Sequence, residues 1–256
     1  MERAIMLQNL LEQAKEVDVP DAFVLQNKKL LKVNLAACGG QVLTKAGAMI
    51  AYQGQMTFSK KGGGVDKWIK KKVSGEDFAL SEVTGQGDLF CADAANDIIL
   101  LYLNNEAIGV ESLNLLAFTP SINWDIKMIK GMAGMAAGGL FNVELQGTGY
   151  LALISKGECM ALTVTPNSPT YTDPHATIAW SAGLEPSVHK DVNLSGLKSL
   201  YGSMTSGETF QLAFQGTGYV IVQPSEVPPI TSLQGPGATG GAGGGIGGAF
   251  GSLLGG

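Results

Sequence analysis

The only two histidines of the chain are His175 and His189, and His175 closes the short motif Asp173-Pro174-His175. An Asp and a His two residues apart on a strand share one face, where they could exchange a proton or bind a metal ion. Zinc needs three or four ligands, however, and neither cysteines nor histidines cluster in this sequence. Pro174 favours a turn instead. The motif is therefore either a functional Asp-His pair or a turn. We expect the turn, which would precede an aromatic strand.

Motifs of the common catalytic folds do not occur in this chain. There is no Gly-x-Ser-x-Gly elbow and no P-loop. The run Gly62-Gly63-Gly64 could hold an anion at the start of a helix, but it lacks the Gly-Lys-Ser/Thr ending, so we interpret it as a loop. We therefore assign no catalytic, cofactor-binding or metal-binding residue and expect a non-enzymatic protein. An enzyme assembled from residues that are distant in sequence remains the alternative.

The stretch Lys67–Lys72 combines positive charge with apolar side chains, and we call it the basic segment. Within it, Trp68 and Ile69 share a predicted helical face with Val65 and Val73, while the lysines spread beyond that face. One hypothesis for this pattern is contact with an anionic membrane surface or nucleic acid. The alternative is a solvated connector with Trp68 packed on the protein. The candidate interaction surface consists of Lys67, Trp68, Ile69, Lys70, Lys71 and Lys72.

Composition limits the class of protein and of partner. The 256 residues are 45% hydrophobic and 15% charged, which favours a large core or an oligomer. The net charge of -5 gives no basic character, so we expect no nucleic-acid partner. Cys38, Cys91 and Cys159 stand far apart, which is typical of buried thiols in a reducing compartment. With no signal peptide and no long apolar run, we expect a cytoplasmic protein, peripheral to a membrane at most.

A glycine motif recurs three times between alternating apolar positions. We interpret each copy as two strands joined by a tight Gly-x-Gly turn, a β-hairpin. The same glycines could also allow another backbone to approach closely. The copies are FALSEVTGQGDLF from Phe78, FNVELQGTGYLAL from Phe141 and FQLAFQGTGYVIV from Phe210.

A second motif, Ile or Leu followed by Ala and an aromatic residue, repeats in step with the first. Its alanines are Ala51, Ala117 and Ala179, which lie 66 and 62 residues apart. Two motifs with one period predict a unit of about 65 residues present three times. We expect an all-β fold of three pseudo-repeated antiparallel β-sandwich units around a pseudo-threefold axis, whose units cover one another's sheet edges. The aromatic residues Tyr52, Phe118, Tyr150, Trp180 and Tyr219 are expected to pack in the core.

Three regions follow from these patterns. Residues 1–22 form a leader in which Ile5, Leu7, Leu10, Leu11 and Ala14 predict a short amphipathic helix that Pro20 ends. Residues 23–226 form the triplicated β domain. Residues 227–256 carry no charge, and 12 of the 22 residues from Gly235 to Gly256 are glycine, which predicts a flexible tail.

These motifs together resemble the altered-inheritance-of-mitochondria 24 family, a family of unknown function. The resemblance extends from about Phe23 to Ser225 and implies a fold similar to the tryptophan RNA-binding attenuation protein. It supplies no catalytic residues, and a mitochondrial member's link to the inner membrane implies at most a scaffold-like role. The chain looks like the bacterial branch. The likeness rests on KAGAMIAY (45–52), FTPSINW (118–124), YTDPHATIAWS (171–181) and FQLAFQGTGYVIVQP (210–224).

Two functional hypotheses follow. The first is a non-enzymatic scaffold that self-associates, with a homotrimer expected, and that presents the connectors between strands to a protein partner or an anionic membrane. The second, based on fold analogy alone, is a module that binds a small molecule or RNA. Neither hypothesis requires a cofactor.

Overall fold

The computed structural model describes residues 6–61, 79–129, 141–189 and 211–225, all of which belong to one compact unit, Met1–Glu226. The predicted tail therefore lies outside the described residues. Within these ranges the chain forms one short α-helix, one 3-10 turn and fifteen strands. In chain order they are α1 (Leu7–Gln13), β1 (Phe23–Asn27), β2 (Leu30–Asn34), β3 (Gln41–Lys45), β4 (Met49–Lys61), β5 (Leu80–Cys91), β6 (Asp97–Glu111), η1 (Ser112–Asn114), β7 (Leu115–Phe118), β8 (Ile122–Met128), β9 (Phe141–Ser155), β10 (Met160–Val164), β11 (Thr170–Thr172), β12 (Thr177–Ser181), β13 (Ser187–His189), β14 (Gln211–Phe214) and β15 (Gly218–Val222).

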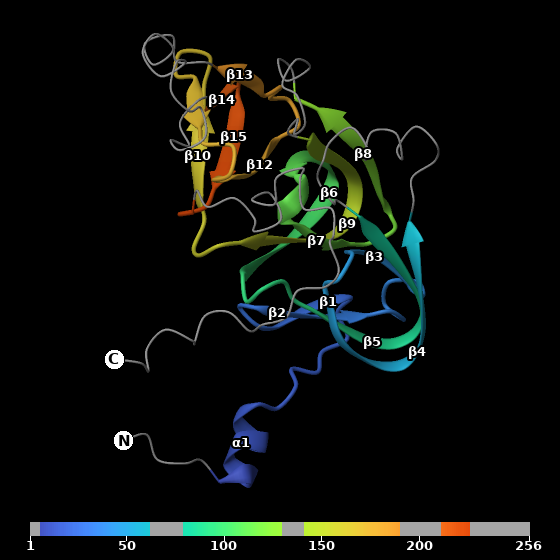
Figure 1. Ribbon diagram of the computed structural model, residues 1–256. Helices are drawn as coiled ribbons and strands as arrows, with labels where there is room; N and C mark the ends of the chain where they lie inside the picture. The colour runs from blue at the N-terminus through green and yellow to red at the C-terminus, as the bar shows by residue number, and fades with distance from the viewer. Residues whose placement is uncertain (1–5, 62–78, 130–140, 190–210, 226–256) are drawn as a thin grey trace, which may run out of the picture. The chain divides into compact units, whose positions relative to one another are not determined.

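The strands form two antiparallel sheets, which confirms the all-β class (Figure 1). The larger sheet follows the order β1-β2-β5-β3-β7-β9-β6-β12-β15-β10, with β4 paired to β5 and β8 paired to β9. The smaller sheet has the order β11-β14-β13. Apolar side chains gather in three separate clusters. Leu31, Leu89 and Ala152 belong to the first, Ile108, Phe118 and Leu145 to the second, and Trp180, Phe214 and Val220 to the third.

The glycine motifs do not form hairpin turns, so that prediction was wrong. Gly85 lies inside β5 and Gly147 lies inside β9, where each pairs with a residue of a neighbouring strand. Both have positive φ, and a Cβ on Gly85 would lie 2.1 Å from the carbonyl oxygen of Gln55. The third copy, at Gly216, joins β14 to β15, which pair with different strands. The motif therefore permits close backbone approach, the other reason considered for these glycines.

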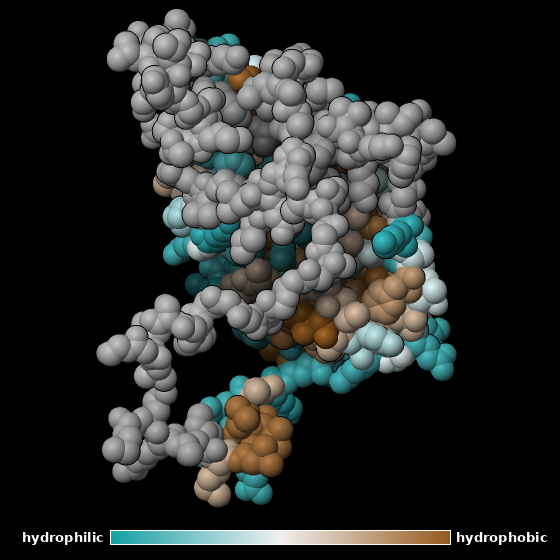
Figure 2. Space-filling view, in the orientation of Figure 1, coloured by the Kyte–Doolittle hydropathy of each residue, from teal (hydrophilic) through white to brown (hydrophobic). Residues whose placement is uncertain are grey.

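The leader helix is shorter than its pattern predicts. Helix α1 ends at Gln13, and the amide of Ala14 donates to the carbonyl of Leu10, so the helix stops well before Pro20. None of its residues is buried. Figure 2 shows its apolar side chains uncovered. A helix this short is marginally stable by itself, and without tertiary contacts no packing energy favours its extension.

The prediction that the repeated aromatic residues pack in the core is correct for only part of the set. Phe118 and Trp180 are almost completely buried. Tyr52 and Tyr219, by contrast, retain 47% and 41% of their surface exposed. For Tyr52 the difference lies in the missing second strand beside β4, whereas Tyr219 is exposed although β15 pairs with both β10 and β12.

Candidate interaction surfaces

The basic segment Lys67–Lys72 lies outside the described residues, between the end of β4 and Ala79. The last described side chain before it, Lys60, is exposed and pairs through its backbone with Ser81 of β5. The other connectors between strands that the scaffold hypothesis would present to a partner also fall largely outside the described residues. Any surface made by Lys67, Trp68, Ile69, Lys70, Lys71 and Lys72 therefore remains a prediction.

The Asp173-Pro174-His175 motif forms a turn. The Asp173 carboxylate accepts hydrogen bonds from the backbone amides of His175, at 2.7 Å, and Ala176, at 3.3 Å. The hydroxyl of Thr177 donates to the Asp173 carbonyl at 2.7 Å and starts β12. The carboxylate thus shapes the backbone before the aromatic strand. His189 lies elsewhere, with its ring tilted against that of Tyr171 at a centroid distance of 4.9 Å.

The cysteines are free thiols. Burial raises the pKa of Cys38 to about 11 and that of Cys91 to about 12, because a thiolate loses hydration in an apolar surrounding. Both thiols therefore stay protonated and unreactive at neutral pH. Across the ranges that the structure describes, no three His, Cys, Asp or Glu side chains gather closely enough to hold a metal ion.

One cavity of about 350 Å³ lies beside Trp180 and Leu184. Its polar lining includes Lys127, whose ammonium group lies 3.4 Å from the Glu144 carboxylate and whose pKa that carboxylate raises. Gly109 forms part of the wall, and a Cβ there would collide with the Trp180 ring. The described lining offers a paired Lys and Glu beside an indole, which suits a small polar ligand, and it includes no Ser, Cys or His nucleophile.

The three Ala-aromatic strands share one local geometry. Each carries a bulge just before its alanine and then pairs with the glycine-motif strand that follows it in the sequence. Ala51 pairs with Phe90, Ala117 with Ala152 and Ala179 with Ile221, and each partner stands five residues after the first glycine of its motif.

The glycines of the motif also meet equivalent neighbours. A Cβ on Gly85 would lie 3.0 Å from the Cα of Met56, and one on Gly147 would lie 3.3 Å from the Cα of Ile122. On Gly216 it would meet the side chain of Leu184 at 3.2 Å. All three neighbours stand four residues after the aromatic residue of their strand. The recurring glycines therefore mark places where the Ala-aromatic chain crosses closely over the next strand.

The three Ala-aromatic strands differ in whether a second strand pairs with them on their other side. β7 also pairs with β3, through Leu43 opposite Phe118, and β12 also pairs with β6, through Gly109 opposite Trp180. Phe118 and Trp180 retain 0% and 1% exposure. Among the described strands β4 pairs with β5 alone, so its first residues, Met49–Tyr52, face solvent, with Ile50 exposed at 60%. We call Met49–Tyr52 the open β4 edge. Figure 2 shows hydrophobic atoms uncovered where β4 and β5 run.

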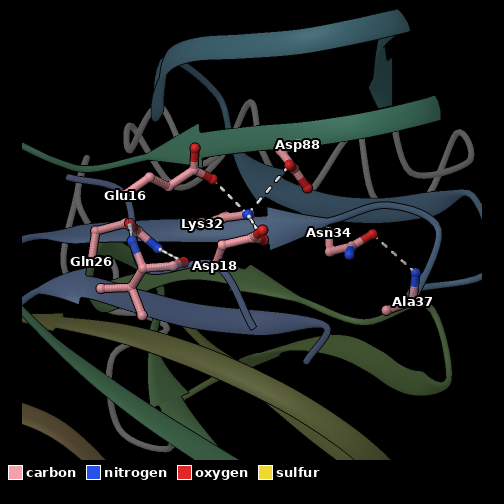
Figure 3. A network of polar contacts seen from close by, with 8 residues as sticks. Glu16, Asp18, Gln26, Lys32, Asn34, Ala37 and Asp88 are labelled. Atoms are coloured by element: carbon pink, nitrogen blue, oxygen red, sulfur yellow. Dashed lines mark hydrogen bonds and ion pairs between the residues drawn. The ribbon is translucent and has the colours of Figure 1, made fainter. Parts of the chain in front are cut away.

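A buried lysine attaches the leader to the β domain (Figure 3). Lys32 on β2 is 2% exposed, and its ammonium group lies 2.5 Å from the Glu16 carboxylate, 3.2 Å from Asp18 and 3.3 Å from Asp88. These carboxylates raise the pKa of Lys32 against the opposing effect of burial. The Gln26 side chain holds the backbone of Val17 by donating to its carbonyl and accepting from its amide. No sequence pattern indicated this contact, because its acidic residues come from separate segments.

Comparison with known proteins identifies a family. No curated protein matches the chain. A crystal structure of a Streptococcus pyogenes protein is similar, with 22% identity and a TM-score of 0.60, over 79% of this chain and 92% of that one. This likeness supports the fold. In the part of the chain that the structure describes, no helix is long and apolar enough to cross a membrane. The family model for mitochondrial biogenesis AIM24 matches residues 23–225, so the chain belongs to the AIM24 family.

Proposed function

We propose that this protein is a non-enzymatic scaffold that self-associates. The observation that carries the proposal is the open β4 edge, where Met49, Ile50 and Tyr52 remain exposed although the equivalent residues of β7 and β12 are buried. An exposed apolar sheet edge offers unpaired backbone groups and apolar area to another chain. A homo-oligomer, with a trimer favoured, would cover that edge.

The scaffold proposal includes a triplicated architecture. We assign β2–β5 to the first unit, β6–β9 to the second and β10–β15 to the third. The shared bulge and register of the three Ala-aromatic strands support this assignment. Each core cluster is built mainly from one of these units and also takes residues from a neighbouring unit, such as Ala152 of β9 in the first cluster and Leu43 of β3 in the second. An arrangement similar to the tryptophan RNA-binding attenuation protein is what the family resemblance implies for such units.

A membrane surface is the proposed location of the scaffold, with the protein bound peripherally. Two features support this part of the proposal. Helix α1 exposes Leu7, Leu10 and Leu11, and the basic segment combines lysines with Trp68. Apolar side chains that enter the interface, together with lysines near anionic headgroups, are the usual elements of such binding.

Light scattering on the purified protein tests the scaffold proposal, with and without residues 227–256. We expect a trimer in both, because the open edge lies in the β domain. Sedimentation with vesicles tests the membrane part: anionic phosphatidylserine vesicles should bind more protein than neutral phosphatidylcholine vesicles, and added salt should weaken that binding. A monomer in both forms, with no vesicle binding, would contradict the proposal.

A second candidate function is small-molecule binding at the cavity beside Trp180. The paired Lys127 and Glu144 next to an indole favour a small ligand that carries both charge and an aromatic or apolar part. A panel of nucleotides and amino acids should then raise the melting temperature, and Lys127→Met should abolish the rise. RNA, the other ligand suggested by fold analogy, belongs in the same panel.

A further inference from the structure

We infer that the partner covering the open β4 edge is the β11 edge of a second copy of this chain, in an antiparallel pair with a defined register. This inference rests on the proposed self-association and adds which strands meet. It comes from the two junctions between units that the chain makes with itself. Those junctions, β3 with β7 and β6 with β12, serve as templates for a third.

The two internal junctions obey one rule. At the first, Leu43 faces the aromatic residue Phe118 and also pairs with Glu82, three residues before Gly85. At the second, Gly109 faces Trp180 and also pairs with Glu144, three residues before Gly147. The strand that faces the aromatic residue therefore pairs on its other side with the glycine-motif strand of its own unit.

The same rule selects β11 in the third unit. Tyr171 pairs with Ala213, which stands three residues before Gly216, so Tyr171 occupies the position of Leu43 and Gly109. Thr172 then corresponds to Thr44 and Val110. Applied to the open edge, the rule places Tyr171 opposite Tyr52 and Thr172 opposite Ala51.

Neither edge has a second strand beside it among the described strands, although the Thr172 side chain is itself buried. Tyr171 is 44% exposed, and among the described strands β11 pairs only with β14. Tyr52 is 47% exposed on the open β4 edge. The described strands do not pair β11 with β4 of the same chain. Two different edges that fit each other make a head-to-tail contact, which closes into a ring when the rotation permits. A trimeric ring is the form expected here.

Directed crosslinking tests the register. In a Cys159→Ser background, a Tyr52→Cys protein is mixed with a Tyr171→Cys protein and oxidised mildly. Opposed residues on paired strands lie close enough for a disulfide. We expect linked dimers in the mixture at several times the level found in either protein alone. The matched control replaces Tyr52→Cys with Tyr102→Cys, which modifies another exposed tyrosine and should give only background linkage.

Two further measurements distinguish a wrong β4–β11 pairing from a failure of self-association itself. Tyr52→Lys should convert the oligomer to a monomer while its circular dichroism stays unchanged, because Tyr52 is largely exposed. An oligomer that persists in Tyr52→Lys, with no selective crosslink, would overturn the β4–β11 pairing while self-association stands. A Tyr52→Cys/Tyr171→Cys double variant that links within one chain at low concentration would also overturn it, since the chain would then close on its own edge. A wild-type monomer would remove both proposals.

Discussion

The open β4 edge and the buried strands β7 and β12 carry the same motif in opposite surroundings. All three have a bulge before the alanine and the same register on the glycine-motif strand. Phe118 and Trp180 are nevertheless buried while Tyr52 is exposed. The cause is a second neighbouring strand. β7 has β3 beside it and β12 has β6, whereas β4 has no second partner among the described strands. Burial of this motif therefore depends on whether a second strand lies beside it.

The largest expected loss of stability comes from removing the buried aromatic residue of β12. Trp180→Ala should lower the free energy of unfolding by about 3–5 kcal/mol, because it removes a buried indole that contacts Phe214 at a 5.5 Å ring-centroid distance. Urea denaturation measures the change. Tyr219→Ala serves as the control at a partly exposed aromatic position, where we expect a smaller loss. Equal losses at the two positions would contradict the comparison.

Glycine substitutions test the feature that the three strands share. Gly85→Ala should cost about 2–3 kcal/mol, since the new Cβ would collide with the Gln55 carbonyl and Gly85 has positive φ. Gly183→Ala is the matched control, because a Cβ there meets no atom within 4 Å. Thermal and urea unfolding of both variants measure the difference. If Gly85→Ala proved as stable as the wild type, close backbone approach would not explain the motif.

The contact between Lys32 and the leader tests what supports β2, which pairs with β5, the strand that also pairs with the open β4 edge. Lys32→Met should lower the free energy of unfolding by about 1–3 kcal/mol, because three carboxylates lose a buried partner. Lys29→Met is the control. It removes an exposed ion pair to Asp97, and we expect a clearly smaller change than for Lys32→Met.

The pH dependence of that contact has a definite sign. The pKa of Lys32 is raised in the folded protein, so the folded state holds its proton above the ordinary lysine pKa of about 10.4. The contribution is therefore complete below about pH 10 and declines as the pH rises further. Urea titrations at pH 8 and pH 11 should show a steeper loss for the wild type than for Lys32→Met. Parallel losses would contradict a role for this ammonium group.

The smallest effect on the fold is expected at the open edge. Tyr52→Ala should change the stability of the dissociated chain by about 1 kcal/mol or less, because the residue is about half exposed and loses chiefly its edge contact with the Phe58 ring. It should instead abolish the dependence of the melting temperature on protein concentration, which association produces. Melting curves over a hundredfold concentration range measure this. A concentration dependence that survives the substitution would show that another surface associates.

Some of the fold was predictable because it depends on local properties. Alternating apolar residues in β5 and β9 indicated strands, and the turn at Asp173 followed from Pro174 and an Asp side chain that bonds the nearby backbone. The hairpin prediction was wrong because a Gly-x-Gly pair satisfies two different demands. It permits a turn, and it equally permits close approach inside a long strand, and only the pairing of Gly85 with Met56 distinguishes them.

The candidate surfaces were less predictable because they depend on strands that are distant in the sequence. The sequence by itself determined the residue types, the spacing of the recurring motifs and the β character of the stretches around them, since these follow from side-chain shape and backbone preference. Only the tertiary structure decided that Phe118 and Trp180 are covered while Tyr52 is open, and that Lys32 meets Glu16, Asp18 and Asp88. Burial and ion pairing arise from long-range register, and a single strand does not encode which neighbour will lie beside it.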